Sequence, residues 1–522
     1  MNLIPLPKRI DEKGEKISIG KNTIIEGDFH QSCELLKEYL SKFNGGENTK
    51  VVFVKDENIA NEGYEIKRGK DEITIGAATD SGAFYAHVTL RQMMDSEGAI
   101  WADVKDSPKY PYRGFMLDCS RHFWRKEKIK QLLDVMADVK MNVFHWHLSD
   151  DQGWRAEIKK YPLLTQKGTT RRSSALYHPS EDLSKKITKD EKYGEGMFYS
   201  QDDMKEIVAY AAKRHIEVVP EIDMPGHMVA AISCYPELSC RGEDTEVSCR
   251  YGVMDNICCC GKDAIYDFAK DVIDELCEIF PGRYFHIGGD EAPKTRWKQC
   301  PDCQKKIKEL GLKDENALQG YFNIQIAKYL KSKGKRMIGW NEILDARDIM
   351  DKDIVAQWWW KYSVGNKNEK EWMSDGGQCL LSLCPYVYMD HSFSMRPLKK
   401  TYSFSARKLT DDDSNVLGME IPQWCEFIVD EDKLDMLTYA RLIAFSEVCW
   451  TDESQKNYKD FENRLENMRK HFDNLGAKVC PQKIYRGKVK PFYVTTSSAW
   501  AFWNKHHDYE FDEMKKMLGN NK

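Results

Sequence analysis

Near the middle of the 522-residue chain stands the sequence Tyr284-Phe-His-Ile-Gly-Gly-Asp-Glu-Ala-Pro293. Its first half is short, apolar and β-prone, and it is bounded by Pro281-Gly282 and Gly288-Gly289, which predicts a buried strand that ends abruptly. Asp290 and Glu291 follow at once, where a barrel or an open α/β sheet places its chemistry. The two glycines allow the backbone to bend and a ligand to approach. A lone Asp-Glu pair would more often belong to a solvated loop, but the strand and the turn favour a functional site.

The balance of charges and the hydropathy pattern exclude several classes of protein. The formal net charge is −5 and both signs are spread along the chain, so we expect no nucleic-acid face and no polybasic membrane signal. No apolar run is long enough to span a membrane, and the N-terminus lacks the apolar core of a secretion signal. We therefore expect a cytoplasmic protein. A length of 522 residues with 41% hydrophobic content predicts at least two globular domains.

The sixteen cysteines lie at irregular positions, including Cys258-Cys259-Cys260. A chain of this size does not need a disulfide framework, so reduced structural thiols are the favoured interpretation. Cys300-Pro-Asp-Cys303 has the spacing of a zinc knuckle, but the sequence holds no second Cys-x-x-Cys, so a zinc site is the minority alternative. In an exported chain, Cys234, Cys240 and Cys249 could pair instead.

Residues 1–105 predict a small α+β domain. Three short β-prone runs precede a helix-like stretch; they are Val51–Val54, Tyr64–Lys67 and Ile73–Gly76, and the helix-like stretch is Ser81–Met94. Two prolines within Asp106–Tyr112 indicate a domain junction. We expect the second domain to span 106–490, and the aromatic and then charged tail at 491–522 to pack on it as a terminal helix.

From Tyr112 onward, β-prone runs alternate with helical periodicity. The expected strands are Arg113–Asp118, Asn142–His147, Glu217–Ile222, Tyr284–Gly288, Arg336–Gly339, Val355–Trp358, Cys379–Leu383 and Val416–Ile421. One intervening helix carries a capping box at Ser200-Gln-Asp-Asp203, and another is expected at Asn316–Lys333. Eight alternating units predict an α/β fold, a (β/α)₈ TIM barrel, preceded by the small α+β domain. The charged insertion at 168–198 is predicted to be a surface loop.

In such a barrel the residues that follow each strand share one mouth. They are Asp118 and Arg121, Asp150 and Asp151, His227, Asp290 and Glu291, Trp340, Trp359, Tyr388 and Asp390, and Trp424 and Glu426. Aromatic faces stack on sugar rings, while carboxylates and arginine form paired hydrogen bonds with hydroxyls. A protonated carboxylic acid can also donate to a leaving oxygen, so glycoside cleavage fits this set. Any single position could equally be packing, and in Trp358-Trp359-Trp360 at least one ring must face the core.

His286-Ile-Gly-Gly-Asp-Glu291 resembles the signature of glycoside hydrolase family 20, the β-N-acetylhexosaminidases. The resemblance extends to four further motifs in the family's order. They are Arg113-Gly-Phe-Met-Leu-Asp-Cys-Ser-Arg-His-Phe123, Phe144-His-Trp-His-Leu-Ser-Asp-Asp151, Pro220-Glu-Ile-Asp-Met-Pro-Gly-His227 and Gly339-Trp-Asn-Glu342. Residues 1–105 are also similar to the small domain that precedes the barrel in that family, and bacterial members are the most similar.

The resemblance implies an exo-acting, retaining enzyme that hydrolyses terminal non-reducing GlcNAc or GalNAc β-glycosides through an oxazolinium intermediate. Its substrate would be an oligosaccharide or glycoconjugate, with no metal or organic cofactor. Glu291 would protonate the glycosidic oxygen, and Asp290 would hold the N-acetyl group. Tyr388 would donate to the acetamido oxygen, which is itself the nucleophile. Asp150 and His227 would support Glu291.

The same resemblance assigns the substrate-binding residues. Trp340, Trp359 and Trp424 would wall the acetamide pocket. Arg121, Asp390 and Glu426 would bind ring hydroxyls. An intramolecular nucleophile gains from proximity, so the protein needs only to fold the acetamide under the ring. The choice between GlcNAc and GalNAc, the release of a disaccharide, the linkage and the oligomeric state stay open.

Two rival functions fit parts of the sequence. His145-Trp-His147 has the form of a metal-binding strand end, as in metal-dependent barrel hydrolases. Further ligands would have to come from later strands, whose ends carry tryptophan and tyrosine, although His227 is available. A non-catalytic sugar-binding protein would show a damaged acid or acetamide clamp, whereas Asp290, Glu291 and Tyr388 are all present.

Overall fold

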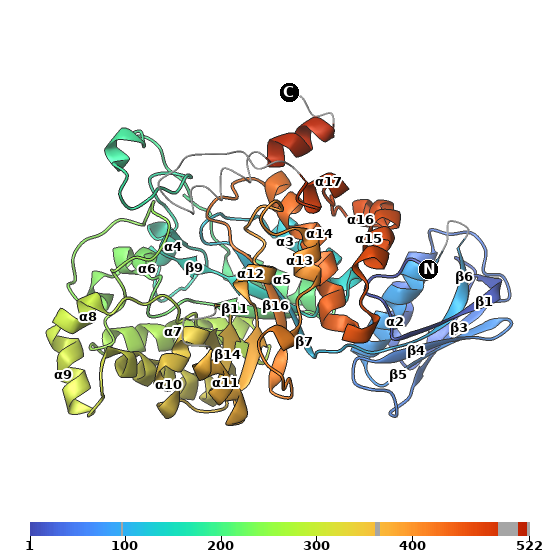
Figure 1. The fold of residues 1–522 in the computed structure, drawn as a ribbon, viewed down its shortest axis with the longest axis horizontal. Helices are drawn as coiled ribbons and strands as arrows, with labels where there is room; N and C mark the ends of the chain where they lie inside the picture. The colour runs from blue at the N-terminus through green and yellow to red at the C-terminus, as the bar shows by residue number, and fades with distance from the viewer. Residues whose placement is uncertain (95–97, 361–365, 489–509, 519–522) are drawn as a thin grey trace.

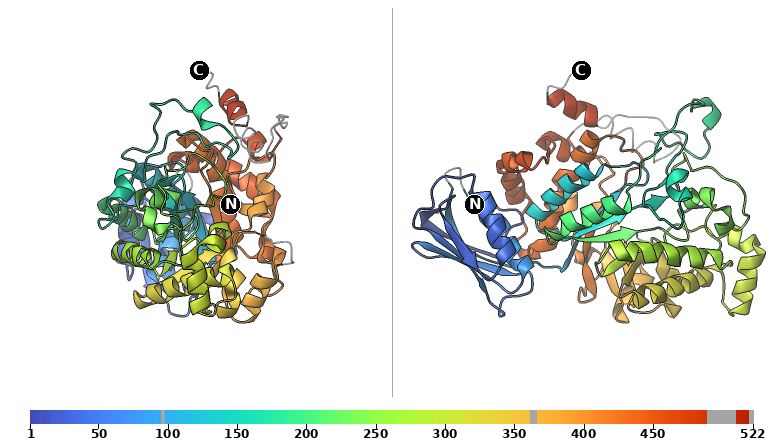
Figure 2. Two further views of the ribbon diagram at one scale, coloured as in Figure 1. Left: turned by 90° about the vertical axis from the view of Figure 1, so that its left-hand side faces the viewer. Right: turned by 180° about the vertical axis from the view of Figure 1, so that it is seen from behind.

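The computed structural model describes residues 1–94, 98–360, 366–488 and 510–518. An N-terminal sheet with two helices lies at one side of a larger barrel (Figures 1 and 2). Within the described residues, no helix combines the length and the apolar character needed to cross a membrane.

The N-terminal domain is a six-stranded mixed sheet in the order β1-β6-β4-β5-β3-β2. Its strands are β1 (Arg9–Ser18), β2 (Ile24–Gly27), β3 (Lys50–Lys55), β4 (Tyr64–Arg68), β5 (Glu72–Ala77) and β6 (Ala99–Asp106), and its helices are α1 (His30–Leu40) and α2 (Asp80–Met93). The three strands and the helix expected from the sequence are β3, β4, β5 and α2. The edge strand β1 has no apolar run, because most of its side chains face solvent.

The two domains meet through buried charged and aromatic side chains. Tyr85 of α2 packs edge-on against Trp450, with ring centroids 5.3 Å apart. Arg113, at the start of the barrel, lies over the same indole and pairs with Glu62 at 2.9 Å. Because Arg113 is fully buried, this pair fixes the barrel's first strand against the N-terminal sheet.

Eight parallel strands close into a barrel in chain order, so the (β/α)₈ prediction is confirmed. The strands are β7 (Tyr112–Asp118), β8 (Val143–His147), β11 (Glu217–Glu221), β12 (Tyr284–His286), β13 (Arg336–Trp340), β14 (Val355–Trp358), β15 (Gln378–Leu381) and β16 (Val416–Gln423). A short hairpin of β9 (Ser149–Asp150) and β10 (Gly153–Trp154) stands at the mouth.

Helices surround the barrel (Figure 1). The longer ones are α3 (Lys126–Asp138), α5 (Gln201–Ala212), α7 (Ala264–Ile279), α9 (Pro301–Glu309), α10 (Glu315–Ser332), α11 (Lys367–Ser374), α14 (Glu431–Trp450) and α15 (Tyr458–Asn467). The shorter ones are α4 (Leu163–Gln166), α6 (Val229–Cys234), α8 (Thr295–Gln299), α12 (Cys384–Val387), α13 (Leu398–Tyr402), α16 (Arg469–Asn474) and α17 (Gln482–Tyr485). The predicted capping box opens α5, where Ser200 and Asp203 cap each other's backbone.

The barrel interior is layered. An apolar layer near the amino ends of the strands contains Tyr112, Val143, Val219, Tyr284, Ile338, Val355, Leu380 and Leu417. Side chains two residues further along a strand point the same way. The next layer therefore contains His145, Glu221, His286, Trp340 and Gln357. Glu420 joins it because the pairing of β15 with β16 shifts register by one residue, and all six are at most 1% exposed. This polar layer forms the floor beneath the carboxyl-end mouth.

The insertion at 168–198 is partly a surface loop, with one 3₁₀ turn, η1 (Leu183–Lys185), in its exposed middle. Its first residues are buried: the Arg171 guanidinium donates to the carbonyl oxygens of Gln152, Ser173 and Ser174. Of the predicted tail, 491–509 and 519–522 lie outside the described residues. Residues 510–517 are helical, and the Glu510 carboxylate accepts hydrogen bonds from the backbone of Phe393 and Ser394.

Candidate active site

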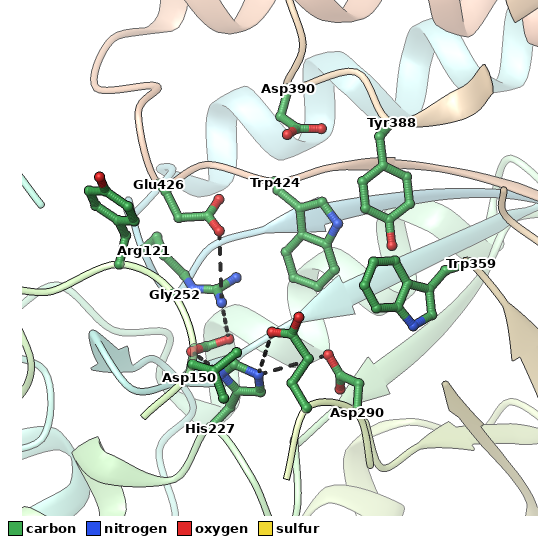
Figure 3. Close-up of a pocket in the computed structure, with 13 residues that line it drawn as sticks. Arg121, Asp150, His227, Gly252, Asp290, Trp359, Tyr388, Asp390, Trp424 and Glu426 are labelled. Atoms are coloured by element: carbon green, nitrogen blue, oxygen red, sulfur yellow. Dashed lines mark ion pairs between the residues drawn. The ribbon is translucent and has the colours of Figure 1, made fainter. Parts of the chain in front are cut away.

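A cavity of about 270 Å³ opens at the carboxyl end of the barrel (Figure 3). It is lined by Arg121, Asp150, His227, Tyr251, Gly252, Val253, Asp290, Glu291, Trp359, Tyr388, Asp390, Trp424 and Glu426. The structure thus brings every residue with a predicted catalytic or binding role, except Trp340, to one surface. The other two expected mouth residues that do not line it, Asp118 and Asp151, are fully buried.

The turn after β12 aims the two acids into this cavity. Gly288 and Gly289 have positive φ angles of 66° and 92°. A Cβ on Gly288 would lie 1.8 Å from Asp223 Oδ1, so only glycine fits there. The Asp223 carboxylate accepts a hydrogen bond from Gly289 N at 3.0 Å and holds the turn. Glu291 itself has φ of 45°, an uncommon conformation for a side chain of this size, which indicates a functional constraint.

His227 connects the acids of two loops. Its Nε2 lies 3.6 Å from Glu291 Oε2 and 3.8 Å from Asp290 Oδ2. On the other side, its Nδ1 lies 3.2 Å from both Asp150 Oδ1 and Asp151 Oδ2. Burial disfavours a charge on the ring, but the surrounding carboxylates, Asp150 first, outweigh burial and raise the His227 pKa well above its usual range. The ring is therefore an imidazolium between two pairs of acids.

Arg121 fixes the opposite side of the same network. Its guanidinium contacts Asp150 at 2.7 Å and Asp118 at 3.2 Å, and it lies 5.1 Å from the Trp424 ring centroid. Burial would raise the Asp150 pKa, yet the charges of Arg121 and His227 lower it. Glu426 lies 4.0 Å from Arg121. There burial dominates and raises the Glu426 pKa to about 7, so this carboxyl group titrates near neutrality.

Asp290 is 8% exposed, and burial raises its pKa to about 6. Its Oδ1 atom is buried and, among the residues that the structure describes, receives no hydrogen bond. A buried acceptor without a donor costs free energy until a ligand supplies one. Asp290 Oδ1 is therefore a ready acceptor for an N–H or O–H group in the cavity.

Aromatic rings form the other wall (Figure 3). Trp359 stacks on Tyr388 with centroids 5.9 Å apart at 19°, and Tyr388 lies 6.3 Å from Trp424. Trp359 Nε1 donates to Glu342 Oε2 at 2.8 Å, which sets the plane of the indole. Burial raises the pKa of Tyr388 well above its usual range, so its hydroxyl stays protonated and can donate.

The tryptophan run begins at the last residue of β14 and divides as strand alternation requires. Trp358 is fully buried in the core, Trp359 lines the cavity and Trp360 is 42% exposed. The third predicted wall residue, Trp340, is not among the residues that line the cavity. It belongs to the polar floor, where its Nε1 donates to Glu221 Oε1 at 2.9 Å, and it supports the Trp424 ring at 5.7 Å.

The histidine pair on β8 belongs to the floor as well. His145 Nδ1 lies 2.9 Å from Glu420 Oε1, while His147 hydrogen bonds to Glu221 and, at 3.0 Å, to Asp150 Oδ2. Both rings are fully buried. A catalytic metal must keep an open position for water or substrate, and these rings are closed off from the cavity. The geometry therefore supports a hydrogen-bonded network here.

Several residues of the site received no individual role from the sequence, although Asp151 was among those expected at the mouth. Asp151 shares His227 with Asp150, Asp223 holds the Gly288-Gly289 turn, and Glu342 orients Trp359. Each lies inside a quoted motif, so a signal existed for them. The Tyr251–Val253 segment lines the cavity from a long polar loop, where neither periodicity nor a motif marks it.

A deep cavity at a barrel mouth, with paired carboxylates on one wall and stacked aromatics on the other, defines a glycoside hydrolase. Residues 110–453 match the catalytic domain of glycosyl hydrolase family 20, and residues 1–106 match domain 2 of that family. The chain therefore belongs to glycosyl hydrolase family 20. It is an exo-acting β-N-acetylhexosaminidase, and enzymes of this family use the 2-acetamido group of the substrate as the nucleophile.

Known relatives are similar to this chain, in sequence and in structure, over most of its length. A β-hexosaminidase of Porphyromonas gingivalis is 34% identical over 543 residues, covering 96% of this chain and 67% of its own. The crystal structure of a β-N-acetylhexosaminidase from Bacteroides fragilis superposes with a TM-score of 0.80 at 29% identity, covering 94% and 99% of the two chains. An exo-β-N-acetylglucosaminidase from Vibrio harveyi, solved with N-acetylglucosamine, gives 0.79 at 30% identity, covering 92% and 78%.

Proposed function

We propose that this chain releases terminal β-linked GlcNAc or GalNAc from oligosaccharides or glycoconjugates, and that Asp290 and Tyr388 hold the acetamido group. The observation that carries this proposal is the buried Asp290 Oδ1 atom, for which the described residues provide no donor. The N–H of a 2-acetamido group is a donor of the right kind. It would satisfy this oxygen and turn the amide beneath the sugar ring.

The aromatic wall then shapes the pocket for the rest of the amide. Trp359 and Trp424 offer apolar faces to the acetamido methyl group, and the Tyr388 hydroxyl donates to the acetamido oxygen. Held in this way, the oxygen lies close to the anomeric carbon and attacks it as the aglycone leaves. A well-oriented intramolecular nucleophile of this kind reaches effective molarities of about 10⁵–10⁸ M.

Glu291 acts as the general acid and then as the base. Its side chain is 37% exposed, so it can reach both the glycosidic oxygen and an incoming water molecule. It first protonates the leaving oxygen. It then removes a proton from the water that opens the oxazolinium ion. The His227 imidazolium, fixed by Asp150 and Asp151, orients the Glu291 carboxyl group from 3.6 Å.

Charged side chains on the loops after β7, β15 and β16 bind the ring hydroxyls in this proposal. Arg121 is held by Asp118 and Asp150, so its remaining donors point in a fixed direction. Asp390 Oδ1 is another buried acceptor with no hydrogen-bond partner within the described part of the chain. A cavity enclosed in this way accepts one terminal sugar, which supports exo cleavage. The Vibrio harveyi relative was solved with N-acetylglucosamine.

A panel of 4-nitrophenyl glycosides tests the proposal. We expect turnover of the β-GlcNAc and β-GalNAc compounds and negligible turnover of the β-glucoside, because the last lacks the nucleophile. Replacing the N-acetyl group by N-trifluoroacetyl should slow the reaction steeply, since fluorine withdraws electrons from the attacking oxygen. Equal rates on the glucoside and its 2-acetamido counterpart would refute the proposal. Tight binding without turnover of the β-GlcNAc compound would instead indicate a sugar-binding protein.

A further inference from the structure

Four cysteine side chains that the proposed reaction does not use meet on the outer side of the barrel. They are Cys240, Cys259, Cys300 and Cys303, and their four Sγ atoms all lie within 4.8 Å of one another. They come from three separate segments: the loop after η2 (Pro236–Leu238), the loop before α7, and the start of α9. Three of them are at most 3% exposed, and each is a free thiol.

The spacing of these sulfur atoms is that of a metal tetrahedron. Cys259 Sγ lies 3.6 Å from Cys300 Sγ and 3.5 Å from Cys303 Sγ, and Cys240 Sγ lies 4.0 Å from Cys303 Sγ. Four thiolates bound to zinc at about 2.3 Å with tetrahedral angles are about 3.8 Å apart. A disulfide would require about 2.05 Å between two of them, so the arrangement matches four ligands better than two bridges.

The backbone segments that carry the four cysteines pack closely against one another. A Cβ on Gly261 would lie 2.3 Å from Cys303 N, so the Cys259-Cys260-Gly261 turn can pack against the start of α9 only with glycine. Cys259 N donates to Leu238 O at 2.7 Å, which brings the Cys240 loop alongside the same turn. Cys300 occupies the N-cap position of α9 and Cys303 lies in the first turn, where the helix N-terminus stabilises thiolates.

From this geometry we propose that Cys240, Cys259, Cys300 and Cys303 bind one structural zinc ion. All four positions of the tetrahedron are filled by sulfur, which is the closed coordination of a structural site and leaves no place for a substrate. The sequence alone offered a single Cys-x-x-Cys pair. The fold supplies the other two ligands, Cys259 and Cys240, which lie 41 and 60 residues before Cys300 in the chain.

The zinc ion would join the two loops that carry the catalytic residues. Cys240 and Cys259 flank the loop with Tyr251–Val253, and Cys300 follows Glu291 after the short helix α8. Cys258, next to Cys259, donates its N–H to Pro225 O at 2.9 Å, two residues before His227. The zinc ion would therefore cross-link the His227 loop to the Glu291 loop. It would stabilise both loops without contacting the substrate.

Metal analysis of the full chain tests this inference, and it does not depend on the proposed reaction. Protein produced in zinc-supplemented medium and purified without chelators should contain one zinc ion per chain, as measured by inductively coupled plasma mass spectrometry. Cys259→Ala should lose the zinc on dialysis. Cys258→Ala is the matched control, because it removes the neighbouring, equally buried thiol that lies outside the cluster. It should retain the zinc.

A second measurement on the wild-type protein covers the case in which Cys259→Ala does not fold. Titration with an organomercurial should release one zinc ion to a chromogenic chelator and lower the melting temperature. Reconstitution with Co²⁺ should give the visible bands of tetrahedral cobalt and a sulfur-to-cobalt charge-transfer band. Wild-type protein without zinc, iron in its place, or disulfide bonds among the four cysteines would each overturn the inference.

Discussion

The two sides of the cavity hold their side chains in place by different interactions. On the acid side the groups are held by charge. The His227 imidazolium lies within 3.8 Å of four carboxylates, those of Asp150, Asp151, Asp290 and Glu291, and Arg121 pairs with Asp150 at 2.7 Å. On the aromatic side, Trp359, Tyr388 and Trp424 are held by stacking and burial. The ion pairs depend on the protonation state of their members, whereas the aromatic packing does not. Substitutions on the acid side should therefore change the chemical step, and substitutions on the aromatic side should change how the substrate is held.

The largest effect is expected for Glu291→Gln, which removes the transferable proton. On a chitobiose-type disaccharide, whose leaving group needs protonation, kcat/KM should fall by about 10³–10⁴. On a 2,4-dinitrophenyl glycoside the first step should be nearly unaffected, because that leaving group departs without a proton. Steady-state kinetics on both substrates make the comparison. The control Glu309→Gln, 60% exposed on α9, should match the wild type. A uniform loss on both substrates would contradict the acid role.

Asp290→Asn should come next, with a loss of about 10²–10³ in kcat because the charged acceptor for the acetamide N–H is gone. A thiazoline mimic of the oxazolinium ion should also bind this variant far more weakly than the wild type. Inhibition constants and kcat measure the two effects. Asp348→Asn replaces an acid that is 93% exposed and serves as the control. Unchanged affinity for the thiazoline would remove Asp290 from the acetamide clamp.

On the aromatic side, Tyr388→Phe removes one hydroxyl group and leaves the stacked ring. If that hydroxyl polarises and aligns the acetamido oxygen, kcat should fall by about 10² while the melting temperature stays close to that of the wild type. Kinetics with thermal denaturation separate the two possibilities. A drop in stability with little change in kcat would assign Tyr388 to packing alone.

A smaller effect is expected for Trp359→Ala, which opens the acetamide wall. We expect KM to rise about 10-fold, the size of one lost aromatic contact, with a smaller change in kcat. The neighbouring Trp360 offers a matched control, because it is 42% exposed and is not among the lining residues. Trp360→Ala should leave both constants unchanged. Equal effects of the two substitutions would place the wall elsewhere.

The smallest effect concerns pH. Burial raises the Asp290 pKa to about 6, so below that pH the carboxyl group is neutral and above it the group is a charged acceptor. If the reaction needs the charged form, kcat/KM should halve near pH 6 and fall about tenfold for each further unit of acidification. Asp290→Asn should lose this acidic limb. A wild-type profile that stays level from pH 7 to pH 5 would show that Asp290 protonation does not limit the reaction.

The barrel strands were predicted to within two residues at each end, because strands buried on both faces are continuous apolar runs. The edge strand β1 escaped prediction because its polar, exposed residues carry no such pattern. Among the site residues, those directly after a strand were identified by position. The position of Trp340 in the layer beneath the Trp424 ring was not predicted, because it depends on which way a strand-end side chain points.

The order of strands and helices, the barrel and the carboxylates at its mouth were determined by the sequence itself, since apolar periodicity and strand ends are local properties of the chain. Only the tertiary structure decided the pairing of His227 with two aspartates and the meeting of four cysteines. It also decided that Asp290 Oδ1 receives no hydrogen bond from the described part of the chain. Each depends on distances between loops that are far apart in the chain. Those distances follow from closing the whole barrel, which no local pattern encodes.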